Sequence, residues 1–156
     1  MMKKTRIIVF NFILVSIICG PVTAGESLSE KYLGERLTCL DLIRINDTMV
    51  LDDQAILIRD NMNNIYINRL PARCFGLRAS GAFSYETSIS RLCKQDIIKV
   101  LEYDNNPGSV CGLGEFVRIK GVSRLSEAAK MLRDGVLDAL VKEGAFETAF
   151  PSENKK

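Results

Sequence analysis

The feature that most constrains the fold of this chain is a set of four cysteines that follows an apolar leader. Lys3, Lys4 and Arg6 form a basic head, residues 7–19 are an almost unbroken apolar run, and Val22-Thr23-Ala24 offers a small-residue cleavage site. This order of segments is typical of a secretory signal peptide. We therefore predict cleavage after Ala24, which leaves 132 of the 156 residues in the oxidising periplasm or outside the cell.

Two alternatives would keep the chain at a membrane. An uncleaved leader could act as an anchor, but the apolar run of 13 residues is shorter than the roughly 20 residues that cross a bilayer. Lipidation of Cys19 would also anchor the chain. Lipoprotein processing requires a small residue before the cysteine, whereas Ile17 and Ile18 precede Cys19. We therefore expect no stable membrane anchor.

Four cysteines remain after cleavage: Cys39, Cys74, Cys93 and Cys111. An even number in an exported chain indicates two disulfides. Of the three possible pairings we favour Cys74–Cys93, which closes a short irregular loop, with Cys39–Cys111, which ties the start of the domain to its last strand. The alternative, a metal site made by four thiolates, normally needs closely spaced cysteine pairs that this chain lacks. We therefore expect no bound metal.

Composition excludes several classes of function. The chain has no histidine, which rules out Ser-His-Asp and Cys-His catalysis and most catalytic zinc sites. Three of its 21 basic residues lie in the leader and none of its 19 acidic residues does, so the remaining chain carries a net charge of −1. Its densest basic group, Arg69, Arg73 and Arg78, is spaced singly. Nucleic-acid binding needs clustered positive charge, so we expect no nucleic-acid partner.

Residues 39–120 read as short apolar runs divided by turn residues, which indicates a mainly β fold. We predict a small antiparallel meander or barrel. The expected strands are 42–45, 48–51, 55–58, 65–68, 97–103 and 110–120. The expected turns are 52–54, 60–64 and 104–108. The stretch 71–94 is less regular, and the expected Cys74–Cys93 bond would order it.

Segments of different character flank this domain. Residues 25–38 are expected to form an N-terminal arm, and residues 146–156 a disordered tail. Residues 121–145 are expected to form one amphipathic helix, capped by Ser123 or Ser126 and followed by Gly144. Its apolar stripe is expected to pack on the sheet, the alternative being a partner helix or a membrane surface. The stripe consists of Leu125, Ala129, Leu132, Val136 and Leu140.

Acidic residues are the only candidates for catalysis. Asp52-Asp53 is the one adjacent acidic pair in the β region, and two carboxylates can divide acid and base roles. Their position in an expected turn favours a structural role instead. With Asp47 and Asp96 they are the groups on which a carboxylate-based hydrolase or lyase would depend. Because nothing shows that these four residues converge, we assign no catalytic residue.

Two further motifs are incomplete. Asp104, Asn106 and Glu115 match positions 1, 3 and 12 of a calcium loop, but Ser109 occupies the position that needs glycine. Gly112-Leu113-Gly114 resembles part of a phosphate-binding loop without its third glycine or a helix directly after it. We expect no cofactor at either motif, and expect the glycines to mark a bulge or a close approach of backbones.

The ordered cysteine motifs resemble a family of small exported proteobacterial proteins that is catalogued as a domain of unknown function. The resemblance covers about half of the chain, from Cys39 to Phe116. It implies export and a small, mostly β domain, and it implies no activity. The matching motifs are Cys39, Asn46-Asp47, Leu51-Asp52-Asp53, Ile56-Leu57-Ile58, Leu70-Pro71-x-x-Cys74-x-Gly76-Leu77, Phe83-Ser84-Tyr85, Leu92-Cys93-x-x-Asp96-x-Ile98 and Cys111-Gly112-Leu113-Gly114-Glu115-Phe116.

Three functions remain open from the sequence. The favoured one is a non-catalytic envelope or binding module whose partner is a protein or a small molecule. The second is an inhibitor or stress-response factor that acts on a secreted protein, for which 74–93 is the candidate loop. The third is the carboxylate-based hydrolase or lyase.

Overall fold

The structure, a computed structural model, describes residues 27–87, 89–101 and 108–146. The expected signal peptide lies outside the described residues, as does all but the first residue of the expected tail.

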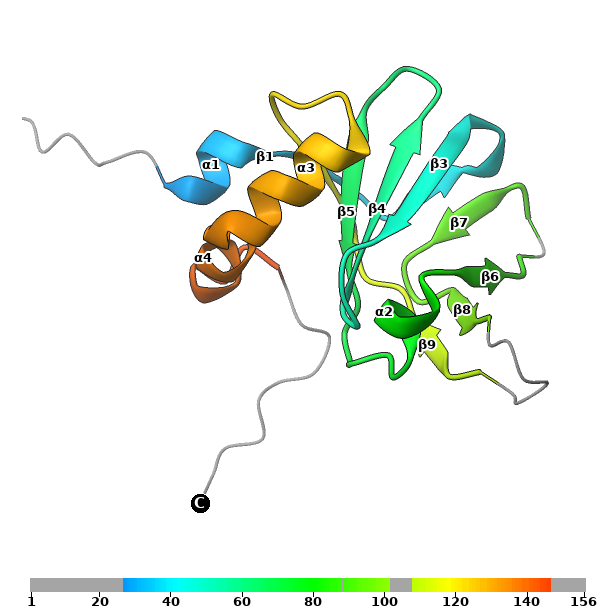
Figure 1. The fold of residues 1–156 in the computed structure, drawn as a ribbon. Coiled ribbons are helices and arrows are strands. Elements are labelled where there is room, and N and C mark those ends of the chain that lie inside the picture. Colours follow the sequence, from blue (N-terminus) through cyan, green and yellow to red (C-terminus); the bar gives the residue numbers. More distant parts are fainter. Residues whose placement is uncertain (1–26, 88, 102–107, 147–156) are drawn as a thin grey trace, which may run out of the picture.

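A five-stranded antiparallel sheet forms the middle layer of the molecule (Figure 1). Strands β3, β4 and β5 follow one another as a meander, and β10 and β1 extend it on the far side of β5. The sequence prediction of an antiparallel meander is therefore confirmed. In spatial order the strands are β1 (Leu33–Leu37), β10 (Phe116–Ile119), β5 (Ile65–Arg69), β4 (Ala55–Asp60) and β3 (Ile45–Val50).

Two smaller antiparallel sheets cover one face of the middle layer. The first pairs β2 (Cys39–Asp41) with β7 (Arg91–Cys93). The second has the order β6 (Phe83–Tyr85), β8 (Ile97–Val100) and β9 (Val110–Gly112). The short helix α2 (Leu77–Ser80) precedes β6. The described strands stay in three separate sheets and close no barrel, so of the two predicted architectures the meander is the one formed.

Helices cover the opposite face of the middle sheet (Figure 1). Helix α1 (Leu28–Tyr32) precedes β1, whereas α3 (Leu125–Met131) and α4 (Leu137–Lys142) form the C-terminal helix. The expected C-terminal helix is therefore present and packs on the sheet. It is interrupted at 132–136, where Gly135 has a left-handed backbone with φ of 102°. None of the helices in the described ranges has the length and apolar character needed to cross a membrane.

Strands β4 and β5 separate two hydrophobic cores. Because neighbouring side chains on a strand point to opposite faces, Leu57 and Ile67 pack against the helices, while Ile56 and Ile58 pack against the small sheets. All four side chains are fully buried. A strand covered on both faces reads as a continuous apolar run rather than as an alternating one. This explains the run Ala55-Ile56-Leu57-Ile58 in the sequence.

Three expected elements differ from the structure. Residues 33–37 of the expected arm form β1, an edge strand of the middle sheet. Residues 42–44 form a single 3-10 turn rather than a strand. The expected strand 110–120 is divided into β9 and β10, which belong to different sheets. The chain passes from one sheet to the other at 113–115, a segment that follows Gly112 and contains Gly114.

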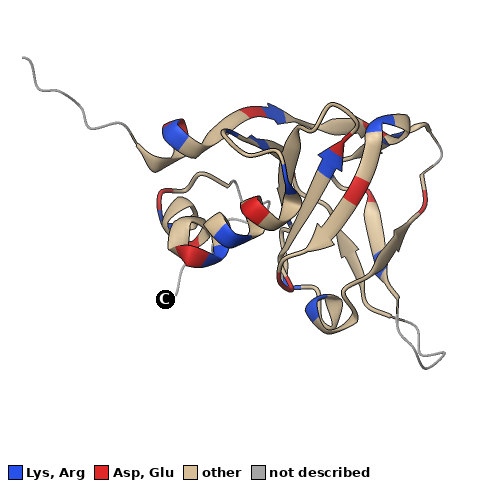
Figure 2. Cartoon of the chain, turned by 45° about the horizontal axis from the view of Figure 1, so that its top comes forward, with Lys and Arg blue, Asp and Glu red and all other residues tan. Residues whose placement is uncertain are grey.

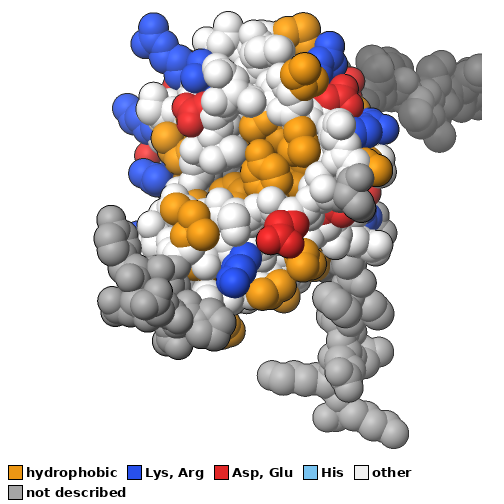
Figure 3. Space-filling model, turned by 90° about the vertical axis from the view of Figure 1, so that its right-hand side faces the viewer, with side chains coloured by type: hydrophobic (Ala, Val, Ile, Leu, Met, Phe, Trp, Pro, Cys, Tyr) orange, Lys and Arg blue, Asp and Glu red, His pale blue; other side chains and the backbone are white. Residues whose placement is uncertain are grey.

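The surface of the described residues mixes charges and apolar side chains. Basic and acidic positions are interspersed over helices and strands rather than separated into faces (Figure 2). On the face that lies to the right in Figure 1, hydrophobic side chains gather in a central hollow (Figure 3). The most exposed large hydrophobic residues include Ile43, Phe75 and Val110.

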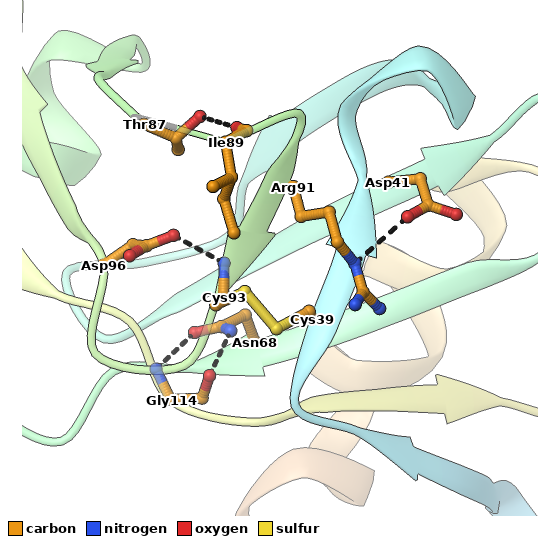
Figure 4. The surroundings of a disulfide bond; sticks show 9 residues. All are labelled: Cys39, Asp41, Asn68, Thr87, Ile89, Arg91, Cys93, Asp96 and Gly114. Carbon is orange, nitrogen blue, oxygen red and sulfur yellow. Dashed lines mark hydrogen bonds and ion pairs between the residues drawn. A yellow bond between two sulfur atoms is a disulfide. The ribbon is translucent and has the colours of Figure 1, made fainter.

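The disulfides pair differently from our expectation. Cys39 bonds to Cys93 across the register pair of β2 and β7, with Cα atoms 3.9 Å apart (Figure 4). Cys74 bonds to Cys111. Two disulfides from these four cysteines are thus present, but the favoured pairing, Cys74–Cys93 with Cys39–Cys111, is wrong. The loop-length argument failed because β2 and β7 pair directly and bring Cys39 opposite Cys93.

This pairing makes two predictions for the oxidised protein. Digestion without reductant should yield peptides that link Cys39 to Cys93 and Cys74 to Cys111. The closed loops span 54 and 37 residues, so the Cys74→Ala/Cys111→Ala double variant should lose about 4 kcal/mol of unfolding free energy. Urea denaturation measures this loss. A linked peptide containing Cys74 and Cys93 would contradict the structure.

Candidate functional site

A polar cavity of the described residues starts from the turn between β3 and β4. The Asp52 Oδ1 atom accepts a hydrogen bond from the Gln54 amide at 2.6 Å. The Leu51 amide donates to the Ala55 carbonyl at 2.9 Å. A side chain that accepts from the amide two residues later is the usual way in which aspartate stabilises a turn. The prediction of a turn at 52–54 is therefore confirmed.

Asp53 attaches the segment that follows β5 to this turn. Its Oδ2 atom accepts from Arg73 Nε at 3.2 Å and from Arg73 Nη2 at 3.0 Å, while its Oδ1 atom accepts from the Arg78 amide at 2.9 Å. Its carbonyl accepts from the Cys74 amide at 2.7 Å. The Arg78 amide first, and then the Arg73 guanidinium, lower the pKa of the Asp53 carboxyl. Asp53 therefore stays ionised and holds Arg73 in place.

A cleft of about 290 Å³ opens beside this turn, and we call it the arginine cleft. It is bounded by the turn, the end of β5, the segment around α2 and the start of α4. An adjoining hollow of about 220 Å³ shares part of this lining and adds Leu51, Leu132 and Arg133. The cleft itself is lined by Asp52, Asp53, Gln54, Arg69, Arg73, Arg78, Leu137 and Asp138.

The interruption of the C-terminal helix lies against this cleft. Gly135, with its positive φ, comes two residues before Leu137 and three before Asp138, which are the first two residues of α4. Residues other than glycine rarely adopt such a backbone, and interruptions of this kind in helices are frequent at functional sites. The bend lets Leu137 contribute an apolar part of the lining while Asp138 remains exposed.

The cleft gathers the three arginines that are spaced singly in the sequence. Arg73 is paired with Asp53. Arg69, which is half-buried, and Arg78, which is exposed, make no ion pair with any described residue. Sequence reasoning missed this site because it looked for a contiguous basic block. The available sequence signal was the occurrence of three arginines within ten residues, starting at the end of a predicted strand.

The four candidate catalytic carboxylates do not form one group. Asp52 and Asp53 line the arginine cleft. Asp47 lies on β3 and pairs with Arg59 at 3.5 Å. Asp96 accepts a hydrogen bond from the Cys93 amide at 2.6 Å (Figure 4). Each of the four therefore has a local structural bond, and only two of them share a cavity.

The glycine pair that resembled a phosphate loop has a packing role at Gly114. Asn68 is fully buried. Its side chain donates to the Gly114 carbonyl at 2.8 Å and accepts from the Gly114 amide at 2.9 Å (Figure 4). A Cβ atom at Gly114 would lie 2.1 Å from the Arg69 carbonyl oxygen, whereas one at Gly112 would meet nothing within 4 Å. The glycine at 114 therefore permits a close approach of two backbones.

Glu115, the third residue of the calcium pattern, lies in a charge network instead. It pairs with Lys94 at 3.1 Å and with Arg36 at 3.5 Å. The Lys94 ammonium, more than the Arg36 guanidinium, lowers the pKa of the Glu115 carboxyl. Asp104 and Asn106 lie outside the described residues. Within the described part of the chain, no three cysteine or acidic side chains are grouped so that they could hold a metal ion.

The aromatic residues within the described ranges do not form an exposed groove. Tyr66 and Phe116 are buried in the core beneath the small sheets, and Phe83 packs against the same core. Phe75 is exposed and stacks under the Arg73 guanidinium, 5.5 Å from its ring centre. Tyr103 lies outside the described residues. Two other cavities lie beside the disulfides, one of about 210 Å³ at Cys39 and one of about 360 Å³ at Cys111.

The two glycines offer a matched pair of substitutions. Gly114→Ala should lower the unfolding free energy by more than about 2 kcal/mol, because the new methyl group clashes with backbone. Gly112→Ala should change it by less than about 0.5 kcal/mol. Urea denaturation of both variants measures the difference. Equal effects of the two substitutions would show that the backbones of Gly114 and Arg69 do not approach each other as closely as described.

The Glu115 network predicts a dependence of stability on pH. Since the pKa of Glu115 is below its ordinary value of 4.5 in the folded state, its contribution is complete above that value and is lost as the pH falls through the lowered pKa. Glu115→Gln should therefore destabilise the protein at pH 7 and have a smaller effect at pH 3. Thermal unfolding at both pH values tests this. A constant difference between wild type and variant would contradict it.

Comparison with known proteins adds no relative: no family model, no curated protein and no solved structure matches the chain.

Proposed function

We propose that the protein is an exported binding module of the periplasm that does not catalyse a reaction. The single observation that carries this proposal is the arginine cleft: a small charged cavity on a crosslinked scaffold, with no nucleophile-and-base pair among the described residues that line it.

The disulfides support an oxidising compartment. Both join segments distant in sequence, and the Cys74 side chain is fully buried. Structural disulfides persist in the periplasm and outside cells, whereas cytosolic thiols are kept reduced. The predicted signal peptide at 1–24 agrees with this location. The resemblance to exported proteobacterial proteins of unknown function forms part of the same proposal.

The cleft supports binding rather than catalysis. The chain has no histidine, and the pKa of Asp53 is lowered, whereas a general acid that works near neutral pH needs a raised one. Asp52 and Asp53 stabilise the turn. Guanidinium groups recognise carboxylates and phosphates through paired hydrogen bonds and remain charged at every physiological pH. These are the properties of a recognition site.

The two alternatives have less support. The hydrolase or lyase needs two carboxylates that are free to act in one cleft. Asp52 and Asp53 share the arginine cleft, but both accept backbone hydrogen bonds that hold the turn and the segment around α2. Asp47 and Asp96 have partners elsewhere. The inhibitor hypothesis relied on a rigid loop closed by Cys74–Cys93. Because Cys74 bonds to Cys111 instead, residues 74–93 are not closed on themselves by a disulfide.

Export is tested by expressing the full chain in a Gram-negative host and fractionating the cells. We expect a periplasmic protein with the mass of residues 25–156, no thiol that reacts with an alkylating agent, and four reactive thiols after reduction. Leu14→Arg, which interrupts the apolar run, should keep the chain in the cytosol, while Cys19→Ser should leave export unchanged. A natively folded, full-length cytosolic protein with reduced cysteines would overturn the proposal.

Binding without catalysis is tested on the same purified protein. Equilibrium dialysis against a periplasmic metabolite extract, followed by mass spectrometry, should show a compound that is retained at unchanged mass. Depletion of one compound with stoichiometric appearance of another would show turnover and contradict the binding module.

A further inference from the structure

The charged residues of the arginine cleft divide into one ion pair and four residues that make no ion pair with a described residue. Asp53 and Arg73 neutralise each other through two hydrogen bonds. The remaining charged residues of the lining are Arg69, Arg78, Asp52 and Asp138. None of these four makes an ion pair within the part of the chain that the structure describes. The cleft therefore offers two positive and two negative groups to a ligand.

This balance selects the chemistry of the ligand. A phosphate or a dicarboxylate would be attracted by the two guanidinium groups but repelled by the two carboxylates. A purely cationic ligand would meet the opposite conflict. A molecule that carries both a carboxylate and an ammonium group satisfies both sets, because each of its ends meets groups of opposite charge.

We propose that the arginine cleft binds a small zwitterion, namely an amino acid or a short peptide. Arg69 and Arg78 receive its carboxylate, and Asp52 and Asp138 receive its ammonium group. This inference rests on the proposed binding function and names its ligand class.

The walls of the cleft suit a small ligand that is held rigidly. Its volume is about 290 Å³, at the lower end of the range of roughly 300–1,000 Å³ for ligand pockets. Leu137 is nearly buried and gives the cleft an apolar contact for a side chain. Asp53 holds the segment that carries Arg73 and Arg78, so part of the recognition surface is already ordered without ligand.

The proposal is tested with L-alanyl-L-alanine as the probe. Titration of the oxidised, ¹⁵N-labelled protein at pH 7 should give saturable shifts of backbone amides around Gln54, Arg78 and Asp138. N-acetyl-L-alanine retains only the carboxylate and L-alaninamide only the ammonium group. Each should bind at least about tenfold more weakly than the dipeptide, because one charge-assisted contact is lost. Inorganic phosphate should also bind more weakly than the dipeptide.

Two variants assign the two ends of the ligand. Arg78→Gln should weaken the dipeptide and N-acetyl-L-alanine about tenfold or more and leave L-alaninamide unchanged, whereas Asp138→Asn should show the reverse preference. Both residues are exposed, and the amide spectrum confirms that the variants are folded. Arg124→Gln is the matched control, since Arg124 is exposed, does not line the cleft and makes no ion pair with a described residue.

Several outcomes would overturn the zwitterion proposal. They are the absence of saturable shifts at the cleft, equal affinity for the dipeptide and either half-ligand, tighter binding of phosphate, or an equal loss of binding in Arg124→Gln. A failure here is distinguishable from failure of the proposed function. If only the zwitterion proposal fails, the protein is still exported, oxidised and able to retain another compound. If the proposed function fails, the protein is cytosolic and reduced, or it converts a compound into another.

Discussion

The burial of β4 and β5 on both faces is the constraint on which the rest of the structure depends. Alternate side chains of these strands belong to two separate cores. One core lies between the middle sheet and the helices, and the other lies between the middle sheet and the small sheets. The small sheets contain strands of only three or four residues, too short to be stable alone. They are held by the core that they share with the middle sheet, by the two disulfides, and by the buried Asn68–Gly114 contact at the point where the chain passes between layers.

Much of the middle layer could be predicted from local sequence. The apolar run 55–58, the Asp and Asn loop after it and the alternating segment 65–68 correspond to β4, its turn and β5, because each signal is contained in neighbouring residues. The apolar stripe of the C-terminal helix could be predicted for the same reason. The division of 110–120 between two sheets could not be predicted, because it depends on contacts of Gly114 with Asn68 and Arg69 on another strand. The disulfide pairing likewise depended on the register between β2 and β7.

The arginine cleft shows why the candidate site was harder to predict than the fold. Its lining comes from four separate segments. The turn at 52–54 was expected, and so was a helix containing Leu137. Their adjacency depends on the bend at Gly135 and on the bonds from Asp53 to the segment around α2. The sequence interpretation of Asp53 as a turn residue is correct but incomplete. Its carboxylate also accepts hydrogen bonds from Arg73 and Arg78, which lie 20 and 25 residues later in the chain.

The interleaved connectivity has a consequence for biogenesis. A polypeptide that enters an oxidising compartment from its N-terminus exposes Cys39, Cys74, Cys93 and Cys111 in that order. The structure joins the first to the third and the second to the fourth, so an oxidase that links successive thiols as they emerge would produce a scrambled crosslink. If the protein is exported as proposed, native pairing therefore requires either that the chain collapses before it is oxidised or that a disulfide isomerase corrects the early product.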